Sequence, residues 1–148
     1  MEGNKTDLRF DYQGALNLAR QLNTLADQVT SAATKRQTLA DTAKKDFIGA
    51  YADQFASRMT VEQTNFRAVA KGLRNDAMDV ARMWKNAMDE ENRHLYGRHV
   101  DHLKQQRSML ESLWDSAFGY RGFPAEPHPV PVPQPPMFLP TADKVSYP

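Results

Sequence analysis

The sequence predicts an all-α fold, and the distribution of proline and of apolar residues carries that prediction. All nine prolines fall at or after Pro124. The proline-free stretch before it is rich in Ala, Leu, Gln, Arg and Lys, as continuous helices require. Apolar residues recur there at steps of three and four residues, the spacing of amphipathic helices. We therefore expect an antiparallel helical hairpin within a body at 1–118 and a proline-rich, extended or disordered tail at 119–148.

The first helix is predicted to begin after Asp11, whose carboxylate suits an N-cap, and to end near Lys44 and Lys45. Phe10 precedes the cap and can act as a staple residue. The predicted seam of this helix consists of Ala15, Leu18, Leu22, Leu25, Val29, Ala32 and Leu39, and Ala19, Ala26, Ala33 and Ala40 widen it. The opposite face, with Arg20, Asn23 and Asp27, is expected to be solvated.

The second helix is predicted to run from about Phe47, with Asp46 as its N-cap. Gly49, one turn in, is expected to allow another backbone to pass close by. The Met and aromatic residues of this helix are interpreted as core. The residues expected to hold the hairpin together are Leu18, Leu22, Leu25, Phe55, Phe66, Val69 and Leu73.

The lengths of the two helices differ. A first helix from Tyr12 to Lys44 is roughly 50 Å long and would cover the second helix to about Asp79. Apolar residues continue beyond that point, so the chain either turns near Gly97 into a third helix or extends as one helix that a partner covers. Because two helices alone make a thin core, pairing into a four-helix bundle is expected, with a second copy or a related protein.

The tail alternates proline with other residues, a pattern that favours polyproline II. It is expected to be either a solvated extended tail or a docking segment. In the second case Met137, Phe138 and Leu139 form its apolar anchor.

Composition excludes several function classes. The formal net charge is +1 and the chain contains no cysteine, so neither a strong field nor thiolate chemistry is expected. No apolar run is long enough for a membrane span, and the polar N-terminus shows no cleaved signal peptide. The basic residues of the second helix alternate with acidic ones, which argues against nucleic-acid binding.

A catalytic or metal site is not expected either. Glu91 and His94 have the Glu-x-x-His spacing of di-metal bundles, but the second such pair is missing. His99, Asp101 and His102 complete this cluster, which we interpret as a solvated polar face. No phosphate loop or hydrolase motif is present. We therefore predict a protein that is not an enzyme and takes no cofactor or metal.

The segment Phe47-Ile48-Gly49, followed by small residues and Phe55, lies at the predicted bend of the hairpin. It resembles the Trp-x-Gly turn of the WXG family, the small helical-hairpin proteins of bacterial type VII secretion, with Phe47 and Gly49 matching the turn motif. The resemblance covers roughly residues 10–95. The export signal of that family, Tyr-x-x-x-Asp/Glu, is absent in strict form, because Tyr96 is followed four residues later by Val100.

The resemblance implies a bacterial protein that is cytoplasmic before export and is secreted without a cleaved signal peptide, or that accompanies a larger toxin or effector as its targeting partner. Its partner would be itself, a related helical hairpin, or the toxin or effector. The alternative is a self-assembling structural or adaptor protein, including a phage or virion component. In either case the residues expected to contact a partner are Trp84, Leu95, Tyr96, Met137, Phe138 and Leu139.

Overall fold

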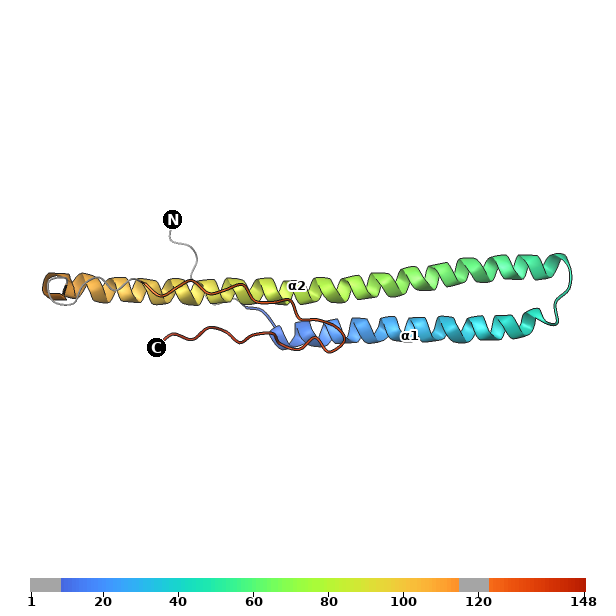
Figure 1. The fold of residues 1–148 in the computed structure, drawn as a ribbon, viewed down its shortest axis with the longest axis horizontal. Helices are drawn as coiled ribbons and strands as arrows, with labels where there is room; N and C mark the ends of the chain where they lie inside the picture. The colour runs from blue at the N-terminus through green and yellow to red at the C-terminus, as the bar shows by residue number, and fades with distance from the viewer. Residues whose placement is uncertain (1–8, 115–122) are drawn as a thin grey trace.

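The computed structural model describes residues 9–114 and 123–148, and its two helices run antiparallel (Figure 1). Helix α1 spans Tyr12–Lys44 and helix α2 spans Ala50–Trp114. The two helices pack against each other along α1, and no strand occurs in the described ranges. The all-α prediction and the hairpin of two helices are therefore confirmed.

The start of α1 follows from its first residues. Asp11 is the N-cap, and its Oδ1 accepts a hydrogen bond of 2.8 Å from the backbone N–H of Gly14. Phe10 packs edge-on against Tyr12 with the ring centroids 4.9 Å apart. Lys44 lies in the last turn, where its charge suits the negative end of the helix dipole. Both predicted ends of α1 are confirmed.

The connection between the helices differs from the prediction. Helix α2 begins at Ala50, so Asp46 lies in the turn and is not the N-cap. Gly49 has φ = +85°, and an added Cβ there would meet nothing within 4 Å. The expected close approach of another backbone at Gly49 is therefore wrong. Glycine is favoured because a side chain strains the left-handed region of φ.

Helix α2 continues without a break through Gly97 to Trp114, so of the two possibilities left open it is the extension that occurs. The hydroxyl of Tyr12 donates a hydrogen bond of 3.0 Å to the carbonyl of Ala87. The Tyr12 side chain thus contacts α2 at Ala87, beyond the expected limit at Asp79. Helix α2 begins at Ala50 instead of Phe47, which moves that limit by three residues, and the long Tyr12 side chain reaches the rest of the way.

Apart from Leu16, alanines and not the predicted leucines of α1 form its contact with α2. The buried residues of α1 include a stripe that recurs every seven residues, which consists of Ala19, Ala26, Ala33 and Ala40. Leu18 and Leu25 are 46% and 45% exposed, and Val69 is also exposed. These three predicted seam residues are therefore wrong as contacts between α1 and α2. The face of α1 that contacts α2 is therefore rotated from the predicted leucine row toward the alanine stripe, because small side chains let the helices approach closely.

Ala32 and Leu39, also predicted in the seam of α1, are exposed and are wrong in the same way. The other residues predicted to hold the hairpin together lie at the margin of the contact. They are partly buried and consist of Leu22, Phe55, Phe66 and Leu73. On the face of α1 expected to be solvated, Asn23 is instead buried and accepts a hydrogen bond of 2.9 Å from Arg74.

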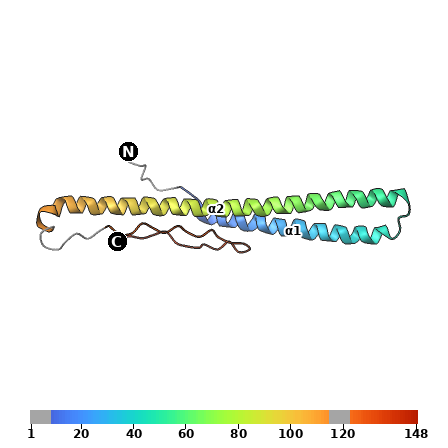
Figure 2. The same ribbon diagram turned by 45° about the horizontal axis from the view of Figure 1, so that its top comes forward.

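Residues 123–148 contain no helix or strand and lie along α2 and the first turns of α1 (Figures 1 and 2). They run toward the turn of the hairpin, reverse direction near residues 135–138 and run back (Figure 2). Two hydrogen bonds hold the reversal: Phe138 N–H to the carbonyl of Gln134 at 2.9 Å, and the Thr141 hydroxyl to the carbonyl of Pro131 at 2.6 Å. The predicted boundary at 118/119 lies outside the described residues.

The largest buried side chains gather where this tail meets both helices. The cluster comprises Leu16, Ala19, Ala77, Ala81, Trp84, Met88, Val130 and Phe138. The tail therefore shares one core with the hairpin. Among the described residues, no helix has the length and apolar character needed to cross a membrane.

Candidate interaction surfaces

The hairpin has two long sides, and one of them carries exposed apolar side chains. Arg36, which follows Leu25 by 11 residues and so shares its face of α1, forms an ion pair of 2.5 Å with Glu62. Glu62 precedes Val69 by one heptad on α2. This pair places the two rows on the same side of the rod, which we name the open flank and define by Leu18, Leu25, Val69 and Met83, each about half exposed.

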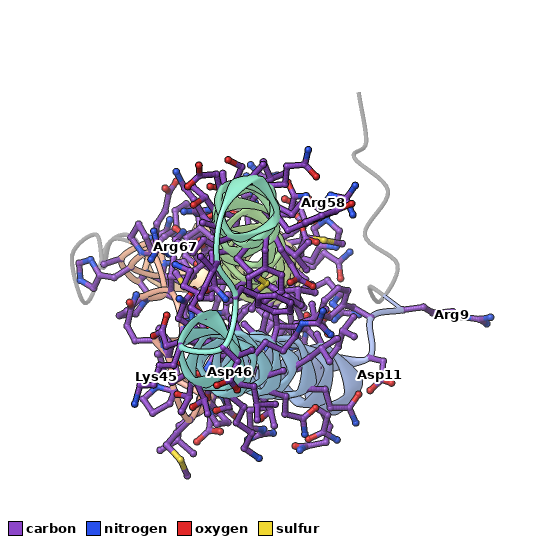
Figure 3. The ribbon with its side chains drawn as sticks, turned by 90° about the vertical axis from the view of Figure 1, so that its right-hand side faces the viewer. Arg9, Asp11, Lys45, Asp46, Arg58 and Arg67 are labelled. Carbon is purple, nitrogen blue, oxygen red and sulfur yellow. The ribbon has the colours of Figure 1, made fainter. Side chains whose placement is uncertain are left out.

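The end of the rod at the turn is also apolar and exposed. Ile48 is 92% exposed, and Phe47 and Tyr51 are exposed beside it. Phe47 packs on Phe55 with the ring centroids 5.4 Å apart, so the two aromatic residues of the motif are in contact. Lys45 and Asp46 lie at this turn, seen end-on in Figure 3. The geometry leaves Ile48 as the most exposed large apolar residue of the turn.

The other side of the rod, which we name the tail flank, is defined by Asn23, Arg74 and Met78, where the tail docks. Arg58 and Arg67 point to opposite sides of α2 in Figure 3. Arg58 precedes Val69 by 11 residues and belongs to the open flank, whereas Arg67 precedes Arg74 by one heptad and belongs to the tail flank. The two flanks are therefore separate surfaces.

Polar side chains of α2 receive the tail. Asp89 Oδ1 accepts a hydrogen bond of 2.7 Å from Val130 N–H, and Asn92 Oδ1 accepts one of 2.9 Å from Val145 N–H. Arg20 donates to the carbonyl of Met137 at 3.3 Å. Asn92 is among the buried polar residues of the structure. These contacts satisfy main-chain groups of the tail that would otherwise lose their hydrogen bonds to water.

Glu91 is buried and links three parts of the chain. Its carboxylate forms an ion pair of 3.2 Å with Lys144 of the tail and accepts a bond of 3.4 Å from the Tyr12 hydroxyl of α1. Burial, followed by the charge of Glu91 and its hydrogen bond, raises the pKa of Tyr12 to about 12. The Tyr12 hydroxyl is therefore a proton donor throughout the neutral range.

The predicted partner-contacting residues separate into three groups. Trp84 and Phe138 are fully buried in the same core cluster, so their assignment to a surface for another protein is wrong for this structure. Leu95 and Tyr96 are partly buried, and the Tyr96 hydroxyl donates a hydrogen bond of 2.9 Å to the carbonyl of Pro124. Met137 and Leu139 are exposed on either side of Phe138.

The polar cluster of α2 makes contacts within the chain. His94 lies 2.9 Å from Glu90, His99 stacks on Tyr147 with the ring centroids 4.5 Å apart, and His102 lies 2.9 Å from Gln106. Over residues 9–114 and 123–148, no group of three or more His, Cys, Asp or Glu side chains is placed to hold a metal ion.

Sequence reasoning missed the polar residues that bind the tail. Asn92 and Asp89 carry no signal of their own, because a polar residue on a long helix is usually solvated. A signal did exist for Asn23, which follows Ala19 by four residues and precedes Ala26 by three, so it lies beside the alanine stripe on α1.

Comparisons with models of protein families, with curated proteins and with solved structures found no match to this chain.

Proposed function

We propose that this chain is a protein-binding helical hairpin, a WXG-like component of a type VII secretion system that acts as a secreted substrate or as the targeting partner of a larger toxin or effector. In this proposal the open flank packs against a second hairpin to form a four-helix bundle. The partner is a second copy, a related hairpin or the toxin or effector itself, and the protein is bacterial and cytoplasmic before export.

The single observation that carries the proposal is the row of half-exposed apolar residues on the open flank. Isolated apolar residues on a surface are ordinary, but a row along both helices of a rod is typical of an interaction site. The accessible surface of the chain is 11007 Å², compared with about 7,700 Å² expected for a compact monomer of this mass. An elongated hairpin therefore has ample surface for a partner interface.

The turn gives further support. Phe47 and Gly49 lie at the bend between α1 and α2, where the turn motif of the family lies, and Phe47 contacts Phe55. The exposed Ile48 beside them provides a recognition point at the end of the rod.

The experiment is the native mass of the protein purified mildly from its own host, for the wild type and for two variants. A one-to-one complex with a small helical protein or a toxin supports the proposal, and Leu25→Glu should dissociate it because a charge would be buried in the interface. Ser31→Glu is the matched control, since Ser31 is exposed on another face of α1. A monomeric wild type, or equal effects of both variants, contradicts the proposal.

A second candidate is a self-assembling structural or adaptor protein, which the length of α2 favours. At 65 residues, α2 is roughly 97 Å long and extends far beyond the start of α1 (Figure 1). The same mass measurement separates the two candidates, because a pure multiple of the 16.8 kDa chain larger than a dimer favours self-assembly.

A further inference from the structure

The chain's own tail occupies the tail flank, and the way in which Phe138 binds there indicates which class of ligand the flank accepts. Phe138 is 0% exposed, whereas its neighbours Met137 and Leu139 are 59% and 57% exposed. Only one side chain of this apolar triplet therefore enters the groove between the helices, where it packs in the core cluster with Leu16 and Trp84.

The backbone explains this selectivity. Phe138 has φ = +42°, in the left-handed region that bulky residues seldom adopt. This conformation directs Phe138 inward while both neighbours remain exposed. Such backbone strain persists where the surroundings hold it in place, and it is common at ligand clamps.

The groove also suits an extended ligand that is rich in proline. The backbone groups of a helix bond to one another, so an extended chain lying on helices finds few main-chain partners. Proline has no N–H to satisfy, and five of the residues from 131 to 140 are prolines. Two N–H groups of the tail find acceptors on side chains of α2. Val130 N–H donates a hydrogen bond to Asp89, and Val145 N–H donates one to Asn92.

The groove continues beyond Phe138. A cleft next to its ring is lined by Asn23, Asp27, Arg74 and Met78 of the helices, together with Pro135 and Pro136. Arg74 bridges Asn23 and Asp27 at 2.9 and 2.7 Å, so it fixes this wall. The helices thus supply an apolar hole for one aromatic ring and polar groups on either side of it.

We propose that the tail flank is a peptide-binding site for an extended, proline-flanked phenylalanine segment, and that it accepts this segment from the tail of a second copy in exchange for its own. The occupant is the segment around residues 130–138, seated there in the structure. Because the chain's own tail is tethered, it competes at an effective concentration in the millimolar range. This inference does not depend on the secretion proposal, which concerns the open flank.

The first test uses a fluorescent synthetic peptide of residues 123–148 and the full-length Phe138→Ala protein, whose own tail lacks its anchor. We expect this peptide to bind the variant at least tenfold more tightly than it binds the wild type, where the resident tail competes. A peptide with Phe138→Ala should bind at least tenfold more weakly, whereas one with Met137→Ala should bind like the original. Absence of binding to the variant protein, or equal binding of the three peptides, overturns the proposal.

The second test needs no variant and therefore does not depend on whether Phe138→Ala folds. Hydrogen exchange of the wild-type chain is followed at the amides of Val130, Phe138 and Val145, all of which are hydrogen-bonded. Release of the tail predicts that these amides exchange at least tenfold faster than the amide of Ala81 in α2. Exchange at the rate of Ala81 would show that the tail opens only with the whole core, and would overturn the proposal.

Discussion

The two halves of the rod are packed differently. The half near the tail buries Leu16, Trp84, Met88 and Phe138, whereas the half near the turn buries mainly alanines and Met59. The difference follows from the number of layers. Where the tail adds a third layer, large side chains can be enclosed; where only two helices meet, a large side chain remains partly exposed and small residues fill the contact. Core size therefore changes along a single pair of helices.

The largest effect is expected where the three layers meet. Trp84→Ala should lower the free energy of unfolding by about 3–5 kcal/mol, because it leaves a cavity between α1, α2 and the tail. Urea unfolding followed by circular dichroism measures this. Met83→Ala is the control: Met83 is the adjacent residue but faces the open flank, so its change should stay within about 0.5 kcal/mol. Similar losses of unfolding free energy for the two variants would contradict the idea that the third layer encloses Trp84 but not Met83.

The extent to which the sequence predicts this fold depends on the signal each residue carries. Asp11 and Lys44 mark the ends of α1 because caps and charges act locally. The face of contact was mispredicted because leucine carries the stronger hydrophobic signal, whereas close packing of the helices favours alanine. The docking of Phe138 depends on residues that are distant in the chain, such as Leu16 and Trp84, and no local pattern encodes such contacts.

The next effect tests the close packing of the two helices at the alanine stripe. Ala26 is fully buried, so Ala26→Leu should force the helices apart and cost about 1–3 kcal/mol of stability. Ala32→Leu adds the same atoms at an exposed position and should change stability by less than about 0.5 kcal/mol. Thermal unfolding of both variants makes the comparison, and equal melting temperatures would show that alanine is not required at this contact.

A smaller effect distinguishes two glycines of α2 and its turn. Gly49→Ala should destabilise by roughly 1 kcal/mol because its φ is positive. Gly97→Ala should stabilise by a similar amount, since Gly97 is helical and an added Cβ meets nothing within 4 Å. Chemical denaturation gives both values. Effects of the same sign would mean that the turn does not impose its conformation on Gly49.

The smallest effect concerns pH. The pKa of Tyr12 is raised from 10.0 to about 12, so the folded state holds this proton more tightly than the unfolded state. The resulting stabilisation is complete below pH 10 and is lost as the pH rises toward 12. Wild-type stability should therefore fall more steeply than that of Tyr12→Phe over this interval, in urea titrations at each pH. Parallel curves would show that burial and the nearby Glu91 do not raise the pKa of Tyr12 in the folded state.

The alanine stripe has a consequence for passage through narrow openings. Each helix with its side chains is about 10–12 Å across, and alanines at the contact keep the pair thin. The half near the turn consists of these two helices alone, with Ile48 at its end. An opening little wider than two helices side by side would therefore admit this half folded and end-first. The tail adds width only farther along the rod. An opening of this size would therefore admit the half near the turn and stop the rod where the tail begins.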